Sequence, residues 1–486
     1  MATVRRHYKG KEYVTHLLRH SYREGSKVKN RTLANLSYLP DQVIDVIRRA
    51  LRGETLVGAG ERFVIERALP HGHVAAVATA ARRLGVPGLL GHDCPERTVA
   101  LGLVVALVCR PGELLSTTGW WGDTTLPGDL GLTEVAADDV SAAMGWLARR
   151  QYRIERRLTD RHLVSGRPGY LHVSSSWQDG RFYPRCSPRR RQRGRTRISL
   201  GLVADSEGRP LAIEVLPGNL GDQTAFAGAV DNVRRRLGLS GVILVGDGSV
   251  ITTARIRALS ETEGVGWIIA PPAPTVRALV GRGVVKPAGL DEGGLAEVPH
   301  PDHPGERLVM FARSGPARRP RQGRALMAAT EAELGLRNLA GGGAVQDEVC
   351  VVRTSAPAET LDAAGVVAAY GNLGFLEQDL RSLPAVAFEL HPASGRFEHQ
   401  VRAGGIFCML AAYVACYLRR IWSPIFSDQH DSLGILLDHL ATLTRVRIVF
   451  DENRLTVDKL AEATDIQRRA FELLDSPIPL TVPWRP

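Results

Sequence analysis

Hydrophobic positions recur at intervals of three and four residues through the early part of the chain, after a polar N-terminal segment. This spacing is typical of amphipathic helices. It predicts three helices, over residues 74–84, 98–109 and 138–158. Asp138 or Ser141 could cap the last of them. Residues 116–132 are rich in Gly, Thr and Trp, and we expect a long loop there.

The pattern changes to alternation after residue 166. Three alternating segments predict strands joined by turns, over 169–176, 196–204 and 210–216. Helices over 222–237 and 251–262 then alternate with strands over 241–247 and 265–269. Three strands in a meander followed by alternating helices and strands predict an α/β sheet.

The pattern weakens over residues 271–344, which are rich in Pro, Gly and Arg and which we interpret as an insertion with one helix over 325–336. Regular elements return as a strand over 348–353 and as helices near 372–382, 401–417, 432–445 and 464–474. The predicted organisation is a basic strand or arm region over 1–59, a helical domain over 60–165, a first core segment over 166–270, the insertion over 271–344, a second core segment over 345–425 and a helical tail over 426–486. The helical domain could bind DNA, or it could serve packing or dimerisation.

Composition narrows the class of protein. Apolar residues make up 44% and charged residues 23% of the 486 residues, which is ordinary for a folded chain. The formal net charge of +11 favours a polyanionic partner, with nucleic acid first, although an arginine-rich composition also arises from GC-rich coding. The six cysteines form no CxxC pair, so a zinc site or a disulfide framework is not expected and a reducing cytosol fits.

No membrane association is expected from the sequence. The N-terminus has no apolar segment typical of a signal peptide. The longest apolar run, Ile406–Leu418, is too short to cross a bilayer and predicts a buried helix. We therefore expect a cytoplasmic, nucleoid-associated protein.

Two basic segments are candidates for DNA contact. Residues 1–35 hold nine Lys and Arg against Glu12 and Glu24, and 13–22 alternates like a strand, which predicts a basic hairpin or arm or else a solvated terminal ribbon. Residues 181–197 hold eight arginines and no acid, so they could neutralise phosphates or form a disordered charged loop. The candidate phosphate contacts in this loop are Arg181, Arg189, Arg190, Arg191, Arg193, Arg195 and Arg197. Trp120 and Trp121 could stack on an unpaired base, but core packing is the commoner role of tryptophan.

Six short segments occur together in a characteristic order. They are Tyr22-Arg-Glu-Gly-Ser-Lys-Val-Lys, Arg31-Thr-Leu-Ala-Asn-Leu-Ser, Trp120-Trp-Gly-Asp-Thr-Thr-Leu, Pro217-Gly-Asn before Asp222, Leu244-Val-Gly-Asp and Gln467-Arg-Arg-Ala-Phe-Glu-Leu-Leu. In this order the chain resembles the bacterial insertion-sequence transposases that carry a Tyr-Arg-Glu-Lys signature around their last catalytic residue. The resemblance covers nearly the whole chain.

The resemblance implies an RNase H-like mixed-sheet catalytic core with an insertion, preceded by a helical domain and followed by a helical tail. It implies that three acidic positions hold two Mg²⁺ or Mn²⁺ ions, which stabilise the attacking and leaving oxygens of a phosphodiester. These catalytic positions correspond to His172, Asp247 and Glu377, with Asp247 and Glu377 as metal ligands. Tyr370 and Arg381 correspond to positions that contact transposon-end DNA. The implied partner is double-stranded DNA, bound by a homodimer that synapses two ends.

The chain departs from the family pattern at polar positions. His172 stands where the first aspartate is expected, and imidazole cannot bridge two magnesium ions as a carboxylate does. The lysine of the signature is Pro384, the residues after Asp247 are Gly248 and Ser249 where Arg and Gly are usual, and an expected histidine is Gly404. We therefore expect a transposase with impaired cleavage. Manganese accepts imidazole better and could support weak cleavage.

Two other functions remain open from the sequence. The chain could be a non-catalytic DNA-binding relic that inhibits transposition or occupies the ends of the element, and His172 is the feature that favours this function. It could also be a nuclease outside transposition, although the helical N-terminal region and the family-like tail argue against that function.

Overall fold

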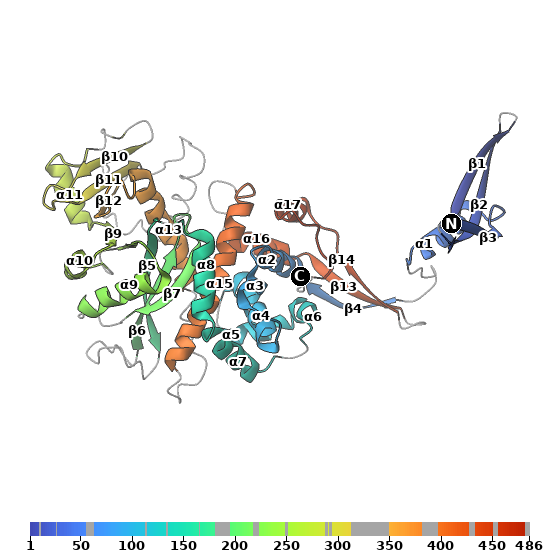
Figure 1. The fold of residues 1–486 in the computed structure, drawn as a ribbon, viewed down its shortest axis with the longest axis horizontal. Coiled ribbons are helices and arrows are strands. Elements are labelled where there is room, and N and C mark those ends of the chain that lie inside the picture. The colour runs from blue at the N-terminus through green and yellow to red at the C-terminus, as the bar shows by residue number, and fades with distance from the viewer. Residues whose placement is uncertain are drawn as a thin grey trace. The chain divides into compact units, whose positions relative to one another are not determined.

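The computed structural model describes residues 1–8, 11–25, 27–54, 63–111, 114–132, 135–164, 166–179, 195–216, 223–247, 251–286, 290, 294–312, 349–381, 397–426, 433–450 and 455–481. The chain divides into two compact units. The first comprises Met1–Arg67 and Arg447–Val457, and the second comprises Ala68–Val446 and Asp458–Pro486. Figure 1 gives the labels of the helices and strands used below.

The N-terminal part of the first unit is a small antiparallel sheet with one helix. Its strands are β1 (Ala2–Tyr8), β2 (Lys11–Glu24) and β3 (Lys27–Asn35), in the order β1-β2-β3, and its helix is α1 (Asp41–Ala50). Leu36 and Ile44 are its buried apolar residues. The predicted basic hairpin is therefore confirmed, with a third strand and a helix that the sequence pattern had not indicated.

A second three-stranded sheet contains β4 (Phe63–Pro70), β13 (Thr444–Phe450) and β14 (Leu455–Leu460), in the order β14-β13-β4. These strands are divided between the two units. None of the three strands was predicted, and the helix predicted over 432–445 includes the first two residues of β13. The helix in question, α16 (Leu433–Ala441), ends earlier, and the alternating segment that follows it pairs as a strand.

The helical region of the second unit contains more and shorter helices than expected. They are α2 (Gly72–Arg83), α3 (Val86–Leu90), α4 (Pro95–Cys109), α5 (Leu114–Trp121), α6 (Leu126–Leu130), α7 (Ala137–Ala148) and α8 (Gln151–His162). The expected loop over 116–132 is wrong, because α5 and α6 lie there. Trp121 explains this difference: it is 2% exposed, and it packs so closely on α4 that a side chain on Gly102 would clash with it. Core packing is thus confirmed for Trp121.

The helix predicted over 138–158 is two helices, α7 and α8, separated by a turn at residues 149–150. The predicted cap at Asp138 or Ser141 is also wrong, because the N-terminal cap position of α7 is Ala136. The Asp139 carboxylate instead accepts a hydrogen bond of 2.9 Å from the Ala136 backbone nitrogen. A carboxylate in the first turn satisfies a backbone donor that the helix leaves unpaired.

The larger sheet has eight strands in the order β10-β11-β12-β9-β8-β5-β6-β7. The strands are β5 (Gly169–Asp179), β6 (Arg195–Ala204), β7 (Pro210–Leu216), β8 (Val242–Asp247), β9 (Val265–Ala270), β10 (Leu295–Pro299), β11 (Arg307–Ala312) and β12 (Val349–Thr354). β5, β8 and β9 are parallel neighbours, and the other pairings are antiparallel. The predicted mixed α/β sheet is confirmed.

The region interpreted as an insertion contributes to this same sheet. It contains α11 (Ala273–Gly281), β10 and β11, and β11 pairs with β12. The helix expected over 325–336 lies outside the described residues.

Helices cover both faces of the sheet. α9 (Gln223–Leu237) and α10 (Thr253–Ser260) pack on the face that carries Leu171 and Leu244. α13 (Ala363–Arg381) packs on the opposite face, which carries Tyr170 and Val245. α15 (Phe397–Trp422) packs on the β6–β7 part of that opposite face, against Leu202.

α15 joins the sheet to the helical region. By length and composition its stretch Arg402–Trp422 could cross a membrane, but 72% of the apolar part of this stretch is buried inside the protein. The buried helix predicted from Ile406–Leu418 is therefore confirmed. The C-terminal helix α17 (Asp465–Leu473) contributes Phe471 to the same core.

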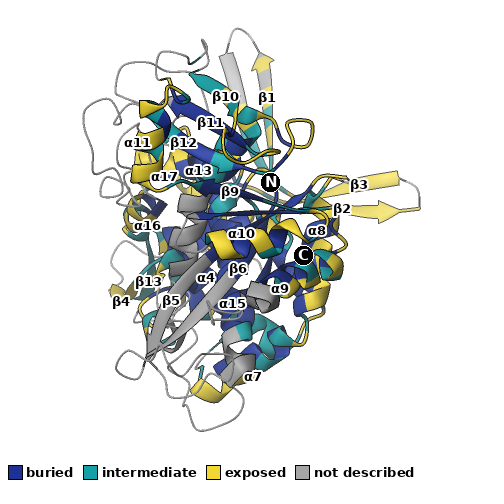
Figure 2. Cartoon of the chain, turned by 90° about the vertical axis from the view of Figure 1, so that its left-hand side faces the viewer, coloured by how far each residue is buried: buried dark blue, intermediate teal, exposed yellow. Residues whose placement is uncertain are grey.

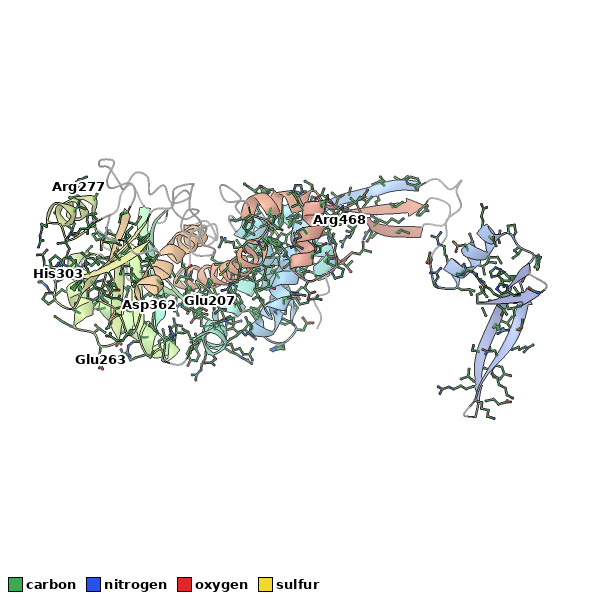
Figure 3. All side chains as sticks on the ribbon, turned by 90° about the horizontal axis from the view of Figure 1, so that it is seen from above. Glu207, Glu263, Arg277, His303, Asp362 and Arg468 are labelled. Carbon is green, nitrogen blue, oxygen red and sulfur yellow. The ribbon has the colours of Figure 1, made fainter. Side chains whose placement is uncertain are left out.

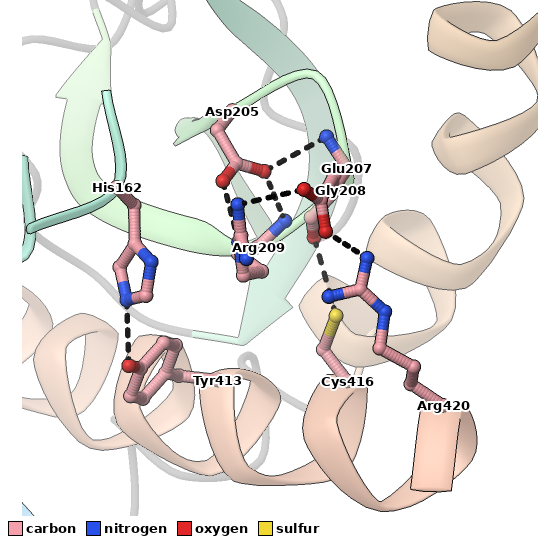
Figure 4. A network of polar contacts seen from close by, with 8 residues as sticks. All are labelled: His162, Asp205, Glu207, Gly208, Arg209, Tyr413, Cys416 and Arg420. Atoms are coloured by element: carbon pink, nitrogen blue, oxygen red, sulfur yellow. Dashed lines mark hydrogen bonds and ion pairs between the residues drawn. The ribbon is translucent and has the colours of Figure 1, made fainter. Parts of the chain in front are cut away.

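The turn between β6 and β7 is fixed to α15 by polar contacts (Figure 4). Asp205 accepts a hydrogen bond of 2.6 Å from Arg209 Nε across the turn. Arg420 on α15 forms an ion pair with Glu207, and the Cys416 thiol donates to the Gly208 carbonyl at 3.7 Å. These contacts hold this end of the sheet against the long helix.

Candidate catalytic and DNA-binding site

His172 lies in the middle of an apolar layer. In β5 it pairs with Leu202 of β6 on one side and with Val245 of β8 on the other. All three residues are buried, with exposed fractions of 1%, 1% and 0%. Strand alternation directs residues at paired positions to the same face of the sheet, so His172 lies between two aliphatic side chains.

This environment keeps the His172 imidazole neutral. Burial lowers the pKa of His172 to about 3, because a charged ring would lose its hydration without gaining a counter-ion. Its Nδ1 atom has no hydrogen-bond partner among the described residues. The predicted first catalytic position therefore offers no negative charge.

Asp247 is the last residue of β8, two residues beyond Val245, the partner of His172. The aliphatic residues 242–245 form the buried part of this strand, and the parallel pairing with β5 places both candidate positions on neighbouring strands. The Asp247 side chain lies outside the described residues. The structure thus brings the backbones of these two positions together.

Glu377 belongs to α13, the helix that covers the face of the sheet carrying Tyr170 and Val245. Five residues before it, Asn372 lies so close to Gly208, in the β6–β7 turn, that a side chain there would approach its Cγ to 2.9 Å. This turn follows Ala204, the partner of Tyr170, and so lies at the end of the sheet away from Asp247. The Glu377 side chain lies outside the described residues, and its assignment stays a prediction.

The predicted DNA contacts are described only in part. Tyr370 is partly buried and packs against the core of Tyr170 and Val366. Arg381 ends α13, and Arg195 and Arg197 pair through their backbones with β5, but these three side chains lie outside the described residues. The remaining arginines of the predicted loop, Arg181, Arg189, Arg190, Arg191 and Arg193, lie outside the described residues entirely.

The one donor side chain described at these positions, that of His172, does not fit a magnesium ion. Magnesium prefers oxygen ligands, and His172 offers only a buried nitrogen. Within the described part of the chain, no three His, Cys, Asp or Glu side chains are grouped to hold a metal. Because the side chains of Asp247 and Glu377 lie outside the described residues, their role as metal ligands remains a prediction.

Exposed cations of the N-terminal sheet were not singled out individually from the sequence. Arg19 and Arg23 on β2, and Lys27 and Arg31 on β3, are all exposed. Alternation over 13–22 had indicated the strand, but only the pairing of β2 with β3 reveals which cations share a face.

One family model matches the N-terminal part of the chain. Residues 1–60 match the family described as IS1634 family transposase, N-terminal domain. The match covers the N-terminal sheet and α1, and it supports an insertion-sequence transposase, as the sequence resemblance predicted. No curated protein matches the chain.

Proposed function

We propose that the chain is an insertion-sequence transposase that binds the DNA of transposon ends and whose DNA cleavage and strand transfer are impaired. The match of residues 1–60 supports the transposase class. The strand order β7-β6-β5-β8-β9, with an antiparallel meander followed by two parallel strands, supports an RNase H-like core. Duplex DNA as partner follows from this class and from the net charge of +11.

The observation that carries the proposed impairment is the environment of His172. A neutral imidazole between Leu202 and Val245 stands on the strand next to the one that ends at Asp247. Cleavage that depends on two metal ions needs carboxylates able to hold and bridge them. With a nitrogen in place of one carboxylate, these positions would bind two metal ions less tightly. The activation of water that the ions supply would be reduced as a result.

A second function follows from the same observation. A transposase that binds ends without cutting them would occupy the sites that an active relative needs, and so inhibit it. Homodimerisation belongs to both proposals, because two ends have to be held together.

The test compares the natural chain with His172→Asp and with His172→Asn, which has the same shape as aspartate without its charge. Each protein is incubated with duplexes from the ends of the element that encodes it, in Mg²⁺ and in Mn²⁺, and nicked and joined products are counted. We expect only His172→Asp to nick in Mg²⁺. We also expect Mg²⁺ to raise the unfolding temperature of His172→Asp alone, because the ion neutralises a buried carboxylate.

Equal nicking by the natural chain and by His172→Asp would contradict the proposed impairment. Binding of the end duplexes without nicking by any of the three proteins would favour the end-occupying function. A chain that binds no duplex at all would exclude both functions.

A further inference from the structure

The outer half of the β2–β3 hairpin is a two-stranded ribbon. β1 pairs with β2 only over residues 11–17, so that beyond Leu18 the strand β2 pairs with β3 alone. A register shift at Leu18/Arg19 marks the point where the ribbon leaves the three-stranded base. Every described residue from Arg19 to Thr32 is exposed (Figure 2). We infer that this ribbon, Arg19–Thr32, enters the major groove of duplex DNA; the inference rests on the proposed function of end binding.

Most cations of the ribbon form no ion pair with any described residue of the chain. It holds five Lys and Arg, and its one acid, Glu24, forms an ion pair with Lys29. Arg19, Arg23, Lys27 and Arg31 form no ion pair among the described residues. Free cations on an exposed strand pair are available to replace the counter-ions of DNA phosphates.

The arginines of the neighbouring helix α1 differ in this respect. Arg49 Nε lies 2.6 Å from Glu54, Arg52 Nε lies 3.9 Å from the same carboxylate, and Arg48 lies 3.4 Å from Asp45. These cations are already paired within the unit. Among the described residues of the N-terminal sheet and α1, the cations without an ion pair therefore lie on the ribbon and not on the helix.

The ribbon has the dimensions that the groove admits. Paired strands lie about 4.8 Å apart, and the major groove of B-DNA, about 12 Å wide, accepts a two-stranded ribbon. The bulge at Leu18/Arg19 increases the right-handed twist of the strand pair. Within the first unit no described helix or loop buries the ribbon, whose described side chains are drawn in Figure 3.

Cross-strand pairing distinguishes the two faces of the ribbon. One face carries the pairs Arg19–Thr32, Ser21–Asn30 and Arg23–Val28, and we name it the Arg19 face. The other carries the pairs His20–Arg31, Tyr22–Lys29 and Glu24–Lys27, and we name it the Lys27 face. Ser21 Oγ donates to Asn30 Oδ1 at 2.6 Å on the first face, and the rings of His20 and Tyr22 stack at 6.3 Å on the second.

The chemistry of the two faces assigns their roles. The Arg19 face combines arginine with asparagine, serine and threonine, all of which can read base edges in the major groove. The Lys27 face combines cations with a stacked ring pair and has no amide side chain, so its cations contact phosphates. The Arg19 face therefore discriminates between sequences, whereas the Lys27 face adds affinity for any duplex.

The test measures binding of the full chain to a labelled end duplex and to a scrambled duplex by fluorescence anisotropy, over a range of salt concentrations. Three double variants are compared: Arg19→Gln with Arg23→Gln, Lys27→Gln with Arg31→Gln, and, as control on α1, Arg49→Gln with Arg52→Gln. Each replaces two exposed charges, so circular dichroism should report the same fold for all of them.

We expect the Arg19-face variant to lose about tenfold or more of the preference for the end duplex. The Lys27-face variant should weaken binding to both duplexes equally and reduce the salt slope by about 2, one for each phosphate contact. The α1 control should bind like the natural chain.

If both ribbon variants bind like the natural chain, the ribbon is not the DNA contact, and the proposed end binding still stands. If the natural chain itself binds neither duplex, the proposed function fails and this inference fails with it. If the two faces have the same effect, the assignment of base reading to the Arg19 face is wrong.

Discussion

The arginine side chains of two parts of the chain differ in their exposure and in their ion pairing. On the β2–β3 ribbon, Arg19 and Arg23 are exposed and form no ion pair among the described residues. In the second unit, Arg236 is 20% exposed and forms ion pairs with the fully buried Glu155 and with Glu214. The paired arginines stabilise the fold, whereas the unpaired ones remain available to a charged ligand.

The buried cluster around Glu155 is the strongest form of the first role. Its carboxylate accepts hydrogen bonds from Gln151 Nε2 at 2.8 Å and from the Ile213 backbone nitrogen at 3.0 Å. Burial raises the pKa of Glu155, although Arg236 and these donors oppose the shift. The cluster joins α8, α9 and β7 through a single side chain.

Replacing Glu155 by alanine should have the largest effect on stability. The change leaves the Ile213 nitrogen without its acceptor and Arg236 with one partner instead of two. We expect a loss of about 3–5 kcal/mol in the free energy of unfolding, measured by urea denaturation. A loss below about 1 kcal/mol would mean that the cluster tolerates removal of its carboxylate, and the comparison would fail.

An intermediate effect on the free energy of unfolding should come from lowering the pH. Burial, and to a smaller extent the charge of His71, lower the pKa of His73 to about 4. Because this folded-state pKa lies below the unfolded value, the contribution of neutral His73 is complete above about pH 6.5 and is lost as the pH falls towards 4. The natural chain should lose about 3 kcal/mol of stability over this interval from this group.

The matched variant is His73→Phe, which keeps a ring against the Trp120 ring, 5.5 Å away, and cannot titrate. Its free energy of unfolding should change less between pH 7 and pH 4 than that of the natural chain. Equal pH dependence of the two proteins would show that another group, such as His71, controls acid sensitivity.

The smallest effect should come from the exposed ion pairs of the first unit. Glu54→Gln removes the partner of Arg49 on the surface of α1, where water already screens the charges. We expect no measurable change in the free energy of unfolding. A clear loss would mean that charge pairing stabilises this unit as it does the buried cluster.

The sequence predicted the strands β5 to β9 of the larger sheet well because their burial produces clear hydrophobic patterns, whereas β10 and β11 of the same sheet were not predicted. β7 begins and ends at the predicted residues, and β6, β8 and β9 begin or end within one residue of prediction. Runs such as Val242–Val245 are buried on both faces of the sheet, a pattern typical of a central parallel strand. The neighbouring positions of His172 and Asp247, now seen in the pairing of β5 with β8, were expected from the family resemblance and not from this pattern.

Elements that depend on distant partners were predicted poorly. β4 is almost entirely exposed, so its residues show no alternation, and it becomes a strand because it pairs with β13. α5 depends on the fit of Trp121 against Gly102, which no local pattern shows. The side chains of Asp247 and Glu377 and the loop of Arg181–Arg193 stay predictions for the site.

Because β4 pairs with β13, this sheet can form only after most of the chain has been synthesised. The ribosome completes the first 50 residues, and with them β1, β2, β3 and α1, before any other element emerges. β4 ends at Pro70, but β13 begins only at Thr444, which at ordinary elongation rates is synthesised on the order of tens of seconds later. A transcript cut short would thus yield a chain that contains β4 without its neighbouring strand β13, a ready substrate for cellular proteases.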